Sequence, residues 1–232
     1  MQSVDTHLPR LADSLLQPEN VRAAFRTGAT DWTPEVRSEP RFTDRPMAAA
    51  AVLIGLVQRP VGLQVLLTQR SQGLNNHAGQ IAFPGGKADA TDASRVATAL
   101  REAQEEVGLA AQWVEVLGSL PTYITGSAYE VTPVLALIQP GFTLEANAHE
   151  VASVFEVPLA FLMDPANHRH HAMQRDGVAR HWLSMPYTPA TQVAGEARGD
   201  GYFIWGATAG MLRNLYRFLL DAGRQLDGPA AR

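Results

Sequence analysis

The sequence contains no cysteine, and this absence excludes several kinds of site. A disulfide framework, a thiolate metal centre and a cysteine nucleophile are all impossible in a chain without that residue. A protein without disulfides is also suited to a reducing compartment, so we expect a cytoplasmic location.

Long apolar runs and a strong net charge are missing as well. The longest apolar run covers residues 47–57, far fewer than the roughly 20 residues that span a bilayer. Residues 8–16 contain Arg10 and Asp13 and therefore lack the continuous apolar centre of an export signal. The net charge of −4 gives no indication of a nucleic-acid or membrane partner.

The composition is that of a folded protein. Of the 232 residues, 46% are hydrophobic and 18% are charged, which is typical of a compact chain with a substantial core. Three prolines and many charges mark the stretch 27–46 as a linker. We therefore expect an N-terminal helical extension with its linker over residues 1–46, and one main domain over residues 47–225.

Hydrophobic periodicity predicts strands in the middle of the chain and helices at its ends. Helices are expected over residues 8–25, with a break at Pro18, over 92–107 and over 203–222. Strands are expected over 48–58, 62–70, 80–83, 114–124, 130–138 and 151–157, with one hairpin through 59–62 and another formed by 168–174 and 179–185. This order of elements predicts an α+β fold.

The predicted helix 92–107 carries the most information about function. Its residues Glu102, Glu105 and Glu106 fall on one face, because they are three and four positions apart. Like charges at that spacing destabilise a helix unless a cation binds between them. Oxygen ligands in a chain without cysteine favour Mg²⁺ or Mn²⁺ over zinc. The alternative is a solvated acidic face on which Arg101 pairs with Glu105.

The ends of this helix and the segment before it add to the pattern. Asp92 or Thr91 is expected to cap the start of the helix, and Gly108 is expected to cap its end. Ahead of the helix, Phe83-Pro84-Gly85-Gly86 ends an apolar segment with two glycines, which let the backbone turn tightly and approach a ligand.

Together these segments resemble the signature of the Nudix hydrolase family. The matching residues are Gly86, Asp92, Arg101, Glu102, Ala103, Glu105, Glu106, Gly108 and Leu109. The family pattern has glutamate where this chain has Asp92, and the stretch from Asp92 to Arg101 is one residue longer than usual. The resemblance implies an α/β/α sandwich around a mixed sheet, and hydrolysis of a diphosphate by attack of water on phosphorus.

The resemblance also implies roles for individual residues. Glu102 and Glu106, with the carbonyl of Gly86, would hold one or more Mg²⁺ or Mn²⁺ ions. Glu105 would be a further ligand or the general base, and Arg101 would hold the carboxylates in place. Glu150 lies where some relatives supply a late metal ligand or base, and its alternative is a solvated loop glutamate.

A second resemblance concerns the substrate. Leu66-Leu67-Thr68-Gln69-Arg70-Ser71, followed by Gly79 and the Gly-Gly turn, is similar to the extra signature of the coenzyme A diphosphatase subgroup. That signature has an arginine where this chain has Asn75. The implied substrate is coenzyme A (CoA), cleaved to 3′,5′-ADP and 4′-phosphopantetheine, with Arg70, Asn75 and His77 as candidate substrate-binding residues.

Two other functions are compatible with the sequence. A Nudix pyrophosphatase could act on another nucleoside diphosphate derivative, such as ADP-ribose or a dinucleotide, and a non-catalytic Nudix module could only bind a nucleotide. In each case the partner is a small nucleotide-type molecule, and a homodimer is compatible with the sequence. Of the remaining residues, His168, His170 and His171 are interpreted as part of a surface hairpin rather than a metal site, and Trp205 as core.

Overall fold

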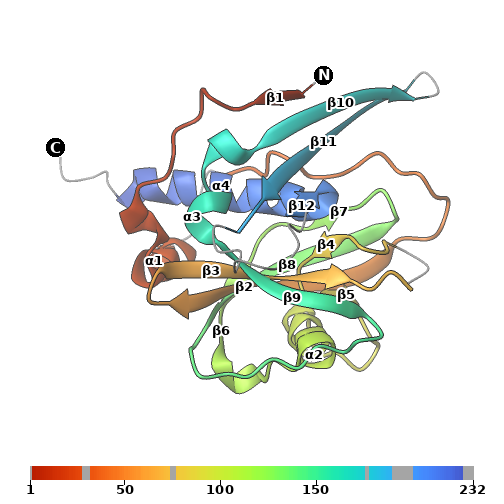
Figure 1. Cartoon of the computed structure of the whole chain (residues 1–232), viewed down its shortest axis with the longest axis horizontal. Helices are drawn as coiled ribbons and strands as arrows, with labels where there is room; N and C mark the ends of the chain where they lie inside the picture. Colours follow the sequence, from red (N-terminus) through yellow and green to blue (C-terminus); the bar gives the residue numbers. More distant parts are fainter. Residues whose placement is uncertain (1, 28–31, 74–76, 176–177, 190–200, 227–232) are drawn as a thin grey trace, which may run out of the picture.

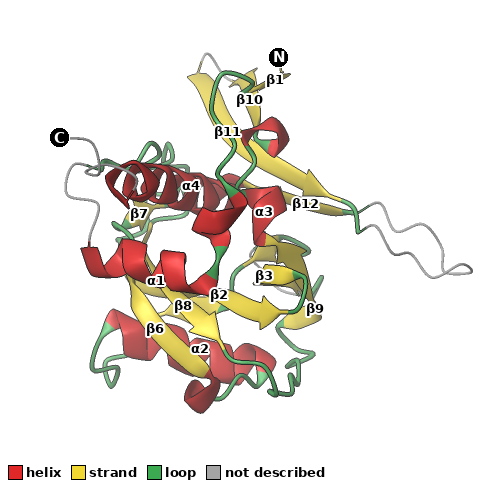
Figure 2. Cartoon of the chain, turned by 90° about the vertical axis from the view of Figure 1, so that its left-hand side faces the viewer, coloured by secondary structure: helices red, strands yellow, loops and turns green. Residues whose placement is uncertain are grey.

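The computed structural model describes residues 2–27, 32–73, 77–175, 178–189 and 201–226. A large sheet lies between helices, and a smaller sheet stands beside it (Figures 1 and 2). None of the helices in these described segments has the length and apolar content needed to cross a membrane.

The large sheet is mixed and has eight strands. Its main path runs β4-β3-β2-β8-β6, with β5 paired to β2, β7 to β8 and β9 to β3. Among the strand pairs of this sheet in the described residues, β2 and β8 are parallel and the others are antiparallel. The strands are β2 (Ala48–Arg59), β3 (Gly62–Arg70), β4 (Ile81–Ala82), β5 (Gly85–Lys87), β6 (Val114–Ser119), β7 (Tyr123–Ile124), β8 (Tyr129–Ile138) and β9 (Val151–Pro158).

Helix α2 (Arg95–Val107) covers one face of this sheet. Its apolar stripe, with Ala99, Ala103 and Val107 fully buried, packs against Leu53 and Val134 of the two parallel strands. Val96 and Leu100 join this contact from the edge of the helix. The apolar positions predicted from the sequence therefore do face the sheet, and the glutamates lie along the neighbouring edge.

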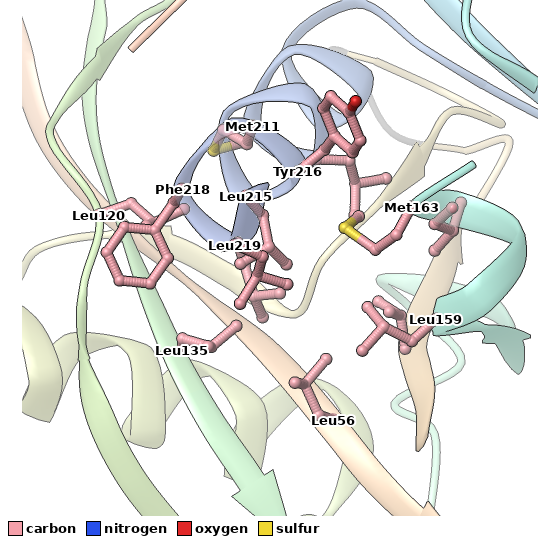
Figure 3. Close-up of a cluster of buried hydrophobic side chains, with 14 of the residues drawn as sticks. Leu56, Leu120, Leu135, Leu159, Met163, Met211, Leu215, Tyr216, Phe218 and Leu219 are labelled. Atoms are coloured by element: carbon pink, nitrogen blue, oxygen red, sulfur yellow. The ribbon is translucent and has the colours of Figure 1, made fainter. Parts of the chain in front are cut away.

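The opposite face of the sheet is covered by α1 (Pro18–Thr27) and α4 (Gly206–Leu226). Figure 3 shows Leu215, Phe218 and Leu219 of α4 pointing toward Leu135 of β8. Short helical turns at Asp13–Leu16, Ala111–Trp113, Leu159–Leu162 (α3) and Pro165–Asn167 complete the helical elements. Helices on both faces of a mixed sheet confirm the expected α/β/α sandwich.

A second, four-stranded sheet has the order β1-β10-β11-β12 and is antiparallel throughout. Its strands are β1 (Gln2–Val4), β10 (Arg169–Arg175), β11 (Val178–Tyr187) and β12 (Tyr202–Trp205). The hairpin predicted from residues 168–174 and 179–185 is confirmed as β10 and β11. On one face of this sheet, Leu183, Met185 and Ile204 are buried.

The N-terminal residues are joined to α4 through one buried arginine, Arg213, which is only 1% exposed. Its guanidinium makes ion pairs with Asp5 and Glu35, each at 2.8 Å. Its Nη1 also donates to Nδ1 of His168 at 2.9 Å, and Nε2 of His168 donates to the carbonyl of Leu162. Segments far apart in sequence therefore meet at a single side chain. We call these residues, with Arg217 as a second partner of Glu35, the Arg213 cluster.

Three helix predictions need correction. The first helix begins at Pro18, and only a short 3-10 turn precedes it within the predicted range 8–25. Helix α2 begins at Arg95, because the hydroxyl of Ser94 caps the amide of Ala97, while Asp92 binds elsewhere. The last helix begins at Gly206, since residues 202–205 pair with β11 as a strand.

Three smaller predictions also differ from the structure. The predicted strand 114–124 is divided into β6 and β7, and Pro121, which has no amide to donate, lies between them. His168 is fully buried in the Arg213 cluster rather than exposed on a hairpin. Trp205 was expected in the core but is 39% exposed, because it lies on the open face of the small sheet.

Candidate active site

The two glycines before α2 form a strand, β5, which pairs with β2 through Val52↔Gly85 and Ala51↔Gly86. Gly85 has φ +157°, and a Cβ at this position would lie 2.4 Å from the carbonyl oxygen of Ala51. No other residue type fits so close to the neighbouring strand. The pairing fixes the backbone of the Gly-Gly segment beside the glutamate helix.

Glu102 points at the second of these glycines. A Cβ on Gly86 would lie 2.5 Å from Oε2 of Glu102 and 2.7 Å from its Oε1, so any side chain there would displace the carboxylate. Burial raises the pKa of Glu102, although the adjacent Arg101 acts in the opposite direction. The carboxylate is therefore held against the backbone of Gly86 in an environment that disfavours its charge.

Glu106 is the most deeply buried acid in this region, at 3% exposure. One oxygen accepts a hydrogen bond from the amide of Gly85 at 3.1 Å, and the other lies 3.7 Å from Nη1 of Arg70. Burial raises its pKa to about 7, and the charges of Glu102 and Glu150 act in the same direction. The amide of Gly85 and the charge of Arg70 lower the pKa of Glu106, but they offset the effect of burial only in part. Such a carboxylate is poised to be stabilised by a cation.

Arg101 holds several of these groups in place. Its Nε and Nη2 bind the two oxygens of Asp92, each at 3.0 Å, and Nη1 lies 2.9 Å from both Glu102 and Glu105. Nη2 also donates to the carbonyl of Lys87 in β5. Hydrogen bonds from Arg101 and from the amide of Asp89 hold the pKa of Asp92 far below its usual range. One side chain thus ties the loop before α2, the helix and the glycine strand together.

These residues open onto a cavity of about 1060 Å³. Six of the residues expected to have functional roles line it, together with Ala82 of β4 and Lys87 of β5. The six are Arg70, His77, Gly86, Glu102, Glu106 and Glu150. The amide of Ser71 binds the carbonyl of Glu150 at 2.9 Å, which ties that residue to the end of β3. The cavity is large enough for a nucleotide-sized ligand.

The structure does not bring every predicted site residue to this cavity. The carboxylate of Glu105 is 56% exposed and turned to Arg101, and neither of these two residues lines the cavity. His77 does line it, and its ring nitrogen lies 2.8 Å from the side chain of Gln80. Asn75 falls outside the described residues.

A divalent cation fits the donors present. Glu106 supplies a buried carboxylate and Glu102 a half-buried one, both with raised pKa values, and Glu150 supplies a third acidic group close enough to affect both. Carboxylate and carbonyl oxygens are the ligands that Mg²⁺ and Mn²⁺ prefer. Among the described residues, no three His, Cys, Asp or Glu side chains are arranged as a complete metal site.

Two functional contacts were missed in the sequence. The amide of Gly85 binds Glu106, and Asp92 is a bidentate partner of Arg101 rather than a helix cap. The Gly-Gly segment was expected to form a tight turn, and its pairing with β2 was not predicted because glycines are rare within strands. Asp92 lies nine residues before Arg101, and a pair at that separation has no periodic pattern in the sequence from which it could be predicted.

Comparison with known proteins identifies a family. Residues 45–186 match the NUDIX domain. The chain is 46% identical to an uncharacterized Nudix hydrolase, NudL, of Salmonella dublin over 76% of this chain and 86% of that protein. It is also 46% identical to the uncharacterized Nudix hydrolase NudL of Escherichia coli over 72% of this chain and 80% of that protein. Among solved structures, a Nudix hydrolase of M. smegmatis, RenU, aligns with a TM-score of 0.42 and 24% identity over 50% of this chain and 73% of that one.

Proposed function

This chain belongs to the Nudix family and is a hydrolase of phosphorus anhydrides, and from that premise we propose that its substrate is CoA or a close derivative. The products would be 3′,5′-ADP and 4′-phosphopantetheine. The observation that carries this proposal is the segment from Leu66 to Gly86, which is similar to the CoA diphosphatase signature and supplies Arg70 and Gly86 to the same cavity.

We propose that the metal is held by the carboxylates of Glu102 and Glu106 with the carbonyl of Gly86. Nudix hydrolases generally use a divalent metal, here proposed as Mg²⁺ or Mn²⁺, which when bound neutralises phosphate charge and activates water. Arg101 orients Glu102 through its 2.9 Å contact, and its bidentate bond to Asp92 keeps the guanidinium in that position.

Arg70 is proposed to bind a phosphate of the substrate. Its Nε is buried and has no hydrogen-bond partner among the described residues, and its Nη1 lies on the cavity side near Glu106. A guanidinium with unused donors is suited to bind phosphate oxygens in a forked geometry. His77, from the same side of the cavity, and Asn75 are proposed as further substrate contacts.

The proton of the attacking water would be accepted by Glu150 or Glu105. Glu150 lines the cavity beside Glu102 and Glu106, whereas Glu105 would have to leave Arg101 before it could act as base or metal ligand. Comparing Glu150→Gln with Glu105→Gln under saturating substrate separates these alternatives. The base is the residue whose amide variant loses more kcat, and the pH profile of that variant should lose its acidic limb.

A substrate panel tests the proposal. The kcat/KM values for CoA, dephospho-CoA and ADP-ribose would be measured with Mg²⁺ and with Mn²⁺, and the products identified by mass. We expect cleavage of CoA to stop when the metal is chelated and to return when either ion is added. Full activity after exhaustive chelation would show that the metal has been assigned wrongly.

A second candidate substrate class follows from one departure in the signature. Asn75 stands where the CoA diphosphatase signature has arginine, so a charged contact to the anionic substrate is absent and ADP-ribose or a dinucleotide becomes the alternative. If CoA is the substrate, Asn75→Arg should lower its KM about tenfold, because a charge-assisted hydrogen bond replaces a neutral one. Preference of both proteins for ADP-ribose, with CoA inert, would assign the alternative.

A further inference from the structure

The loop between β8 and β9 carries Glu150 and runs past α2 (Figure 1). The amides of Glu145 and Asn147 donate to the carbonyls of Val107 and Glu106, each at 2.9 Å. These carbonyls belong to the last turn of α2, where the helix itself offers them no donor. The loop is therefore fixed to the backbone of a proposed metal ligand.

The far end of the loop is fixed to the end of β3. Gln69 pairs with Ser153, but the next residue of β3 pairs with Val151, so β9 contains one extra residue at this point. A bulge of this kind bends a strand and changes the direction of the chain next to it. Beside it, the amide of Ser71 donates to the carbonyl of Glu150 at 2.9 Å. The loop thus joins the helix of the glutamates to the strand that ends in the proposed phosphate ligand.

Two side-chain hydrogen bonds hold the turn that leads to Glu150. Oδ1 of Asn147 accepts from the amide of His149 at 3.2 Å. The hydroxyl of Ser71 donates to the carbonyl of Ala148 at 3.0 Å. Ala148 and His149 are exposed, so apolar packing contributes little to the conformation of this turn. Its geometry therefore depends on hydrogen bonds, to which Asn and Ser side chains are suited.

Electrostatic repulsion acts against this position of Glu150. Its charge raises the pKa of both Glu102 and Glu106, so three carboxylates lie close enough to repel one another. Glu102 and Glu106 are fixed within α2, whereas Glu150 lies in a turn. Before a cation binds, repulsion favours a turn that moves Glu150 away from the other two. The bonds made by Ser71 and Asn147 oppose that movement.

We propose that Ser71 and Asn147 are positioning residues for Glu150, and that they hold its turn so that its carboxylate stays beside Glu102 and Glu106. Neither side chain touches the metal or the substrate in this role, because both act through Glu150. The role of Glu150 itself, as metal ligand or base, rests on the proposed function. A turn that is already ordered loses less conformational freedom when the ligand binds.

A double-mutant cycle on the full-length protein tests this positioning. Glu150→Gln identifies which quantity depends on the carboxylate: the affinity for Mn²⁺ alone, measured by calorimetry, or kcat for whichever diphosphate is cleaved. We expect Ser71→Ala and Asn147→Ala each to lower that same quantity about fivefold, because each removes one hydrogen bond. Added to Glu150→Gln, neither change should cause a further loss, since the group that it positions is already gone.

Conservative variants and matched controls exclude a general effect on folding. Ser71→Thr keeps the hydroxyl, and Asn147→Ser keeps an oxygen that can accept from the amide two residues on, so both should retain most of the wild-type value. Ser153→Ala removes a different hydroxyl bond between β9 and β3, to Gln69, and should change neither quantity. His149→Ala, in the same turn, keeps the backbone amide that Asn147 binds and should also behave as wild type does.

The outcomes separate this proposal from the proposed substrate. Equal losses in the presence and absence of Glu150→Gln would overturn the positioning role, because Ser71 and Asn147 would then act independently of Glu150. Unchanged Mn²⁺ affinity and kcat in Glu150→Gln would overturn it as well. If CoA is inert and ADP-ribose is cleaved, the substrate is wrong, but a closed cycle measured with ADP-ribose would still support the positioning role. A wild type that neither binds Mn²⁺ nor cleaves a diphosphate would overturn both.

Discussion

Two clusters of charged side chains in this protein differ in how their charges are balanced. In the Arg213 cluster, Asp5 and Glu35 each lie 2.8 Å from the buried guanidinium, and Arg217 is a second partner of Glu35. At the glutamate helix, the ion-pair partner of Glu106 within the described residues is Arg70, at 3.7 Å. The first cluster pairs each acid closely, whereas the second leaves carboxylates in excess.

The pKa values record this difference. Burial acts to raise the pKa of Glu35, but the hydrogen bonds from Arg213 and Arg217 outweigh it, and the pKa lies below its usual value. Burial raises the pKa of Glu106 to about 7, and neighbouring acids add to the effect. A balanced cluster supports the fold, while an unbalanced one reduces stability and is retained where a ligand completes it. Four changes test this distinction.

Arg213→Met should give the largest effect, and the effect should be on stability. Removing the guanidinium leaves the buried Nδ1 of His168 without its partner and, among the described residues, leaves Asp5 and Glu35 with only His170 and Arg217 to balance their charges. We expect the free energy of unfolding to fall by about 3–5 kcal/mol, measured by denaturant titration. Arg59→Met is the control. Arg59 forms a partly exposed pair with Glu156, and its loss should lower the free energy of unfolding by about 1 kcal/mol or less. Equal losses of unfolding free energy in both variants would show that the Arg213 cluster stabilises the fold no more than a surface ion pair does.

Glu106→Gln should show the reverse pattern, with the effect on catalysis. The amide keeps the size of the side chain but loses the charge that binds the metal, so kcat should fall about 100-fold. Thermal unfolding without metal should occur at the same temperature or higher, because a repulsive buried charge is gone. Glu115→Gln, at a half-buried pair with Arg22 outside the cavity, is the control for kcat. A less stable Glu106→Gln protein with normal kcat would contradict the comparison.

Gly86→Ala should have a smaller effect on the same site. The added methyl group would displace the carboxylate of Glu102, which lies where a Cβ would be placed. We expect kcat to fall about tenfold, since a shift of less than an ångström in a ligand lowers the rate without removing the ligand. Gly73→Ala, where nothing lies within 4 Å of the added carbon, should leave kcat unchanged.

The smallest expected effect is on the pH dependence of stability without metal. Burial lowers the pKa of His168 to about 4 from 6.5, so the unfolded chain binds more protons between these values and stability rises with pH. The pKa of Glu106 is raised from 4.5 to about 7, so its contribution falls with pH over a similar range. The two effects oppose each other, so the free energy of unfolding should change by only on the order of 1 kcal/mol across this pH range.

Single variants separate these opposing contributions. In Glu106→Gln, stability should rise more steeply between pH 5 and 6.5 than in the wild type, because the opposing contribution of Glu106 is gone and that of His168 remains. In His168→Gln the rise should flatten or reverse. Unfolding free energies measured at several pH values in the presence of a chelator provide the test. Identical slopes in wild type and both variants would contradict these pKa assignments.

Local patterns were sufficient to predict most of the fold. The hairpin β2–β3, the apolar stripe of α2 and the buried side of α4 all follow from periodicities of two or 3.6 residues. Boundaries were less certain, because competing local interactions decide them. Ser94 caps α2 while Asp92, three positions before Arg95 and equally suited to capping, binds Arg101 instead.

Long-range contacts could not be predicted in the same way. The spacing of Glu102 and Glu106 placed them on one helical face, but nothing local indicated that Gly85 would pair with Val52 and donate to Glu106. The Arg213 cluster joins residues 5, 35 and 168 to α4, and such separations have no periodic signature. The roles of Glu102, Glu105, Glu106, Arg101 and Glu150 in catalysis stay predictions.

The contact between Arg213 and the N-terminal acids also limits how the protein can be shortened. The NUDIX match over residues 45–186 is an attractive fragment for expression, yet it lacks Asp5, Glu35 and the whole of α4. Such a fragment would keep His168 without its arginine and would uncover Leu135 and Leu56, which α4 normally covers. We therefore expect the smallest autonomous folding unit to extend beyond the NUDIX match on both sides. Deletion libraries, fusion points and domain transplants should be designed around that larger unit.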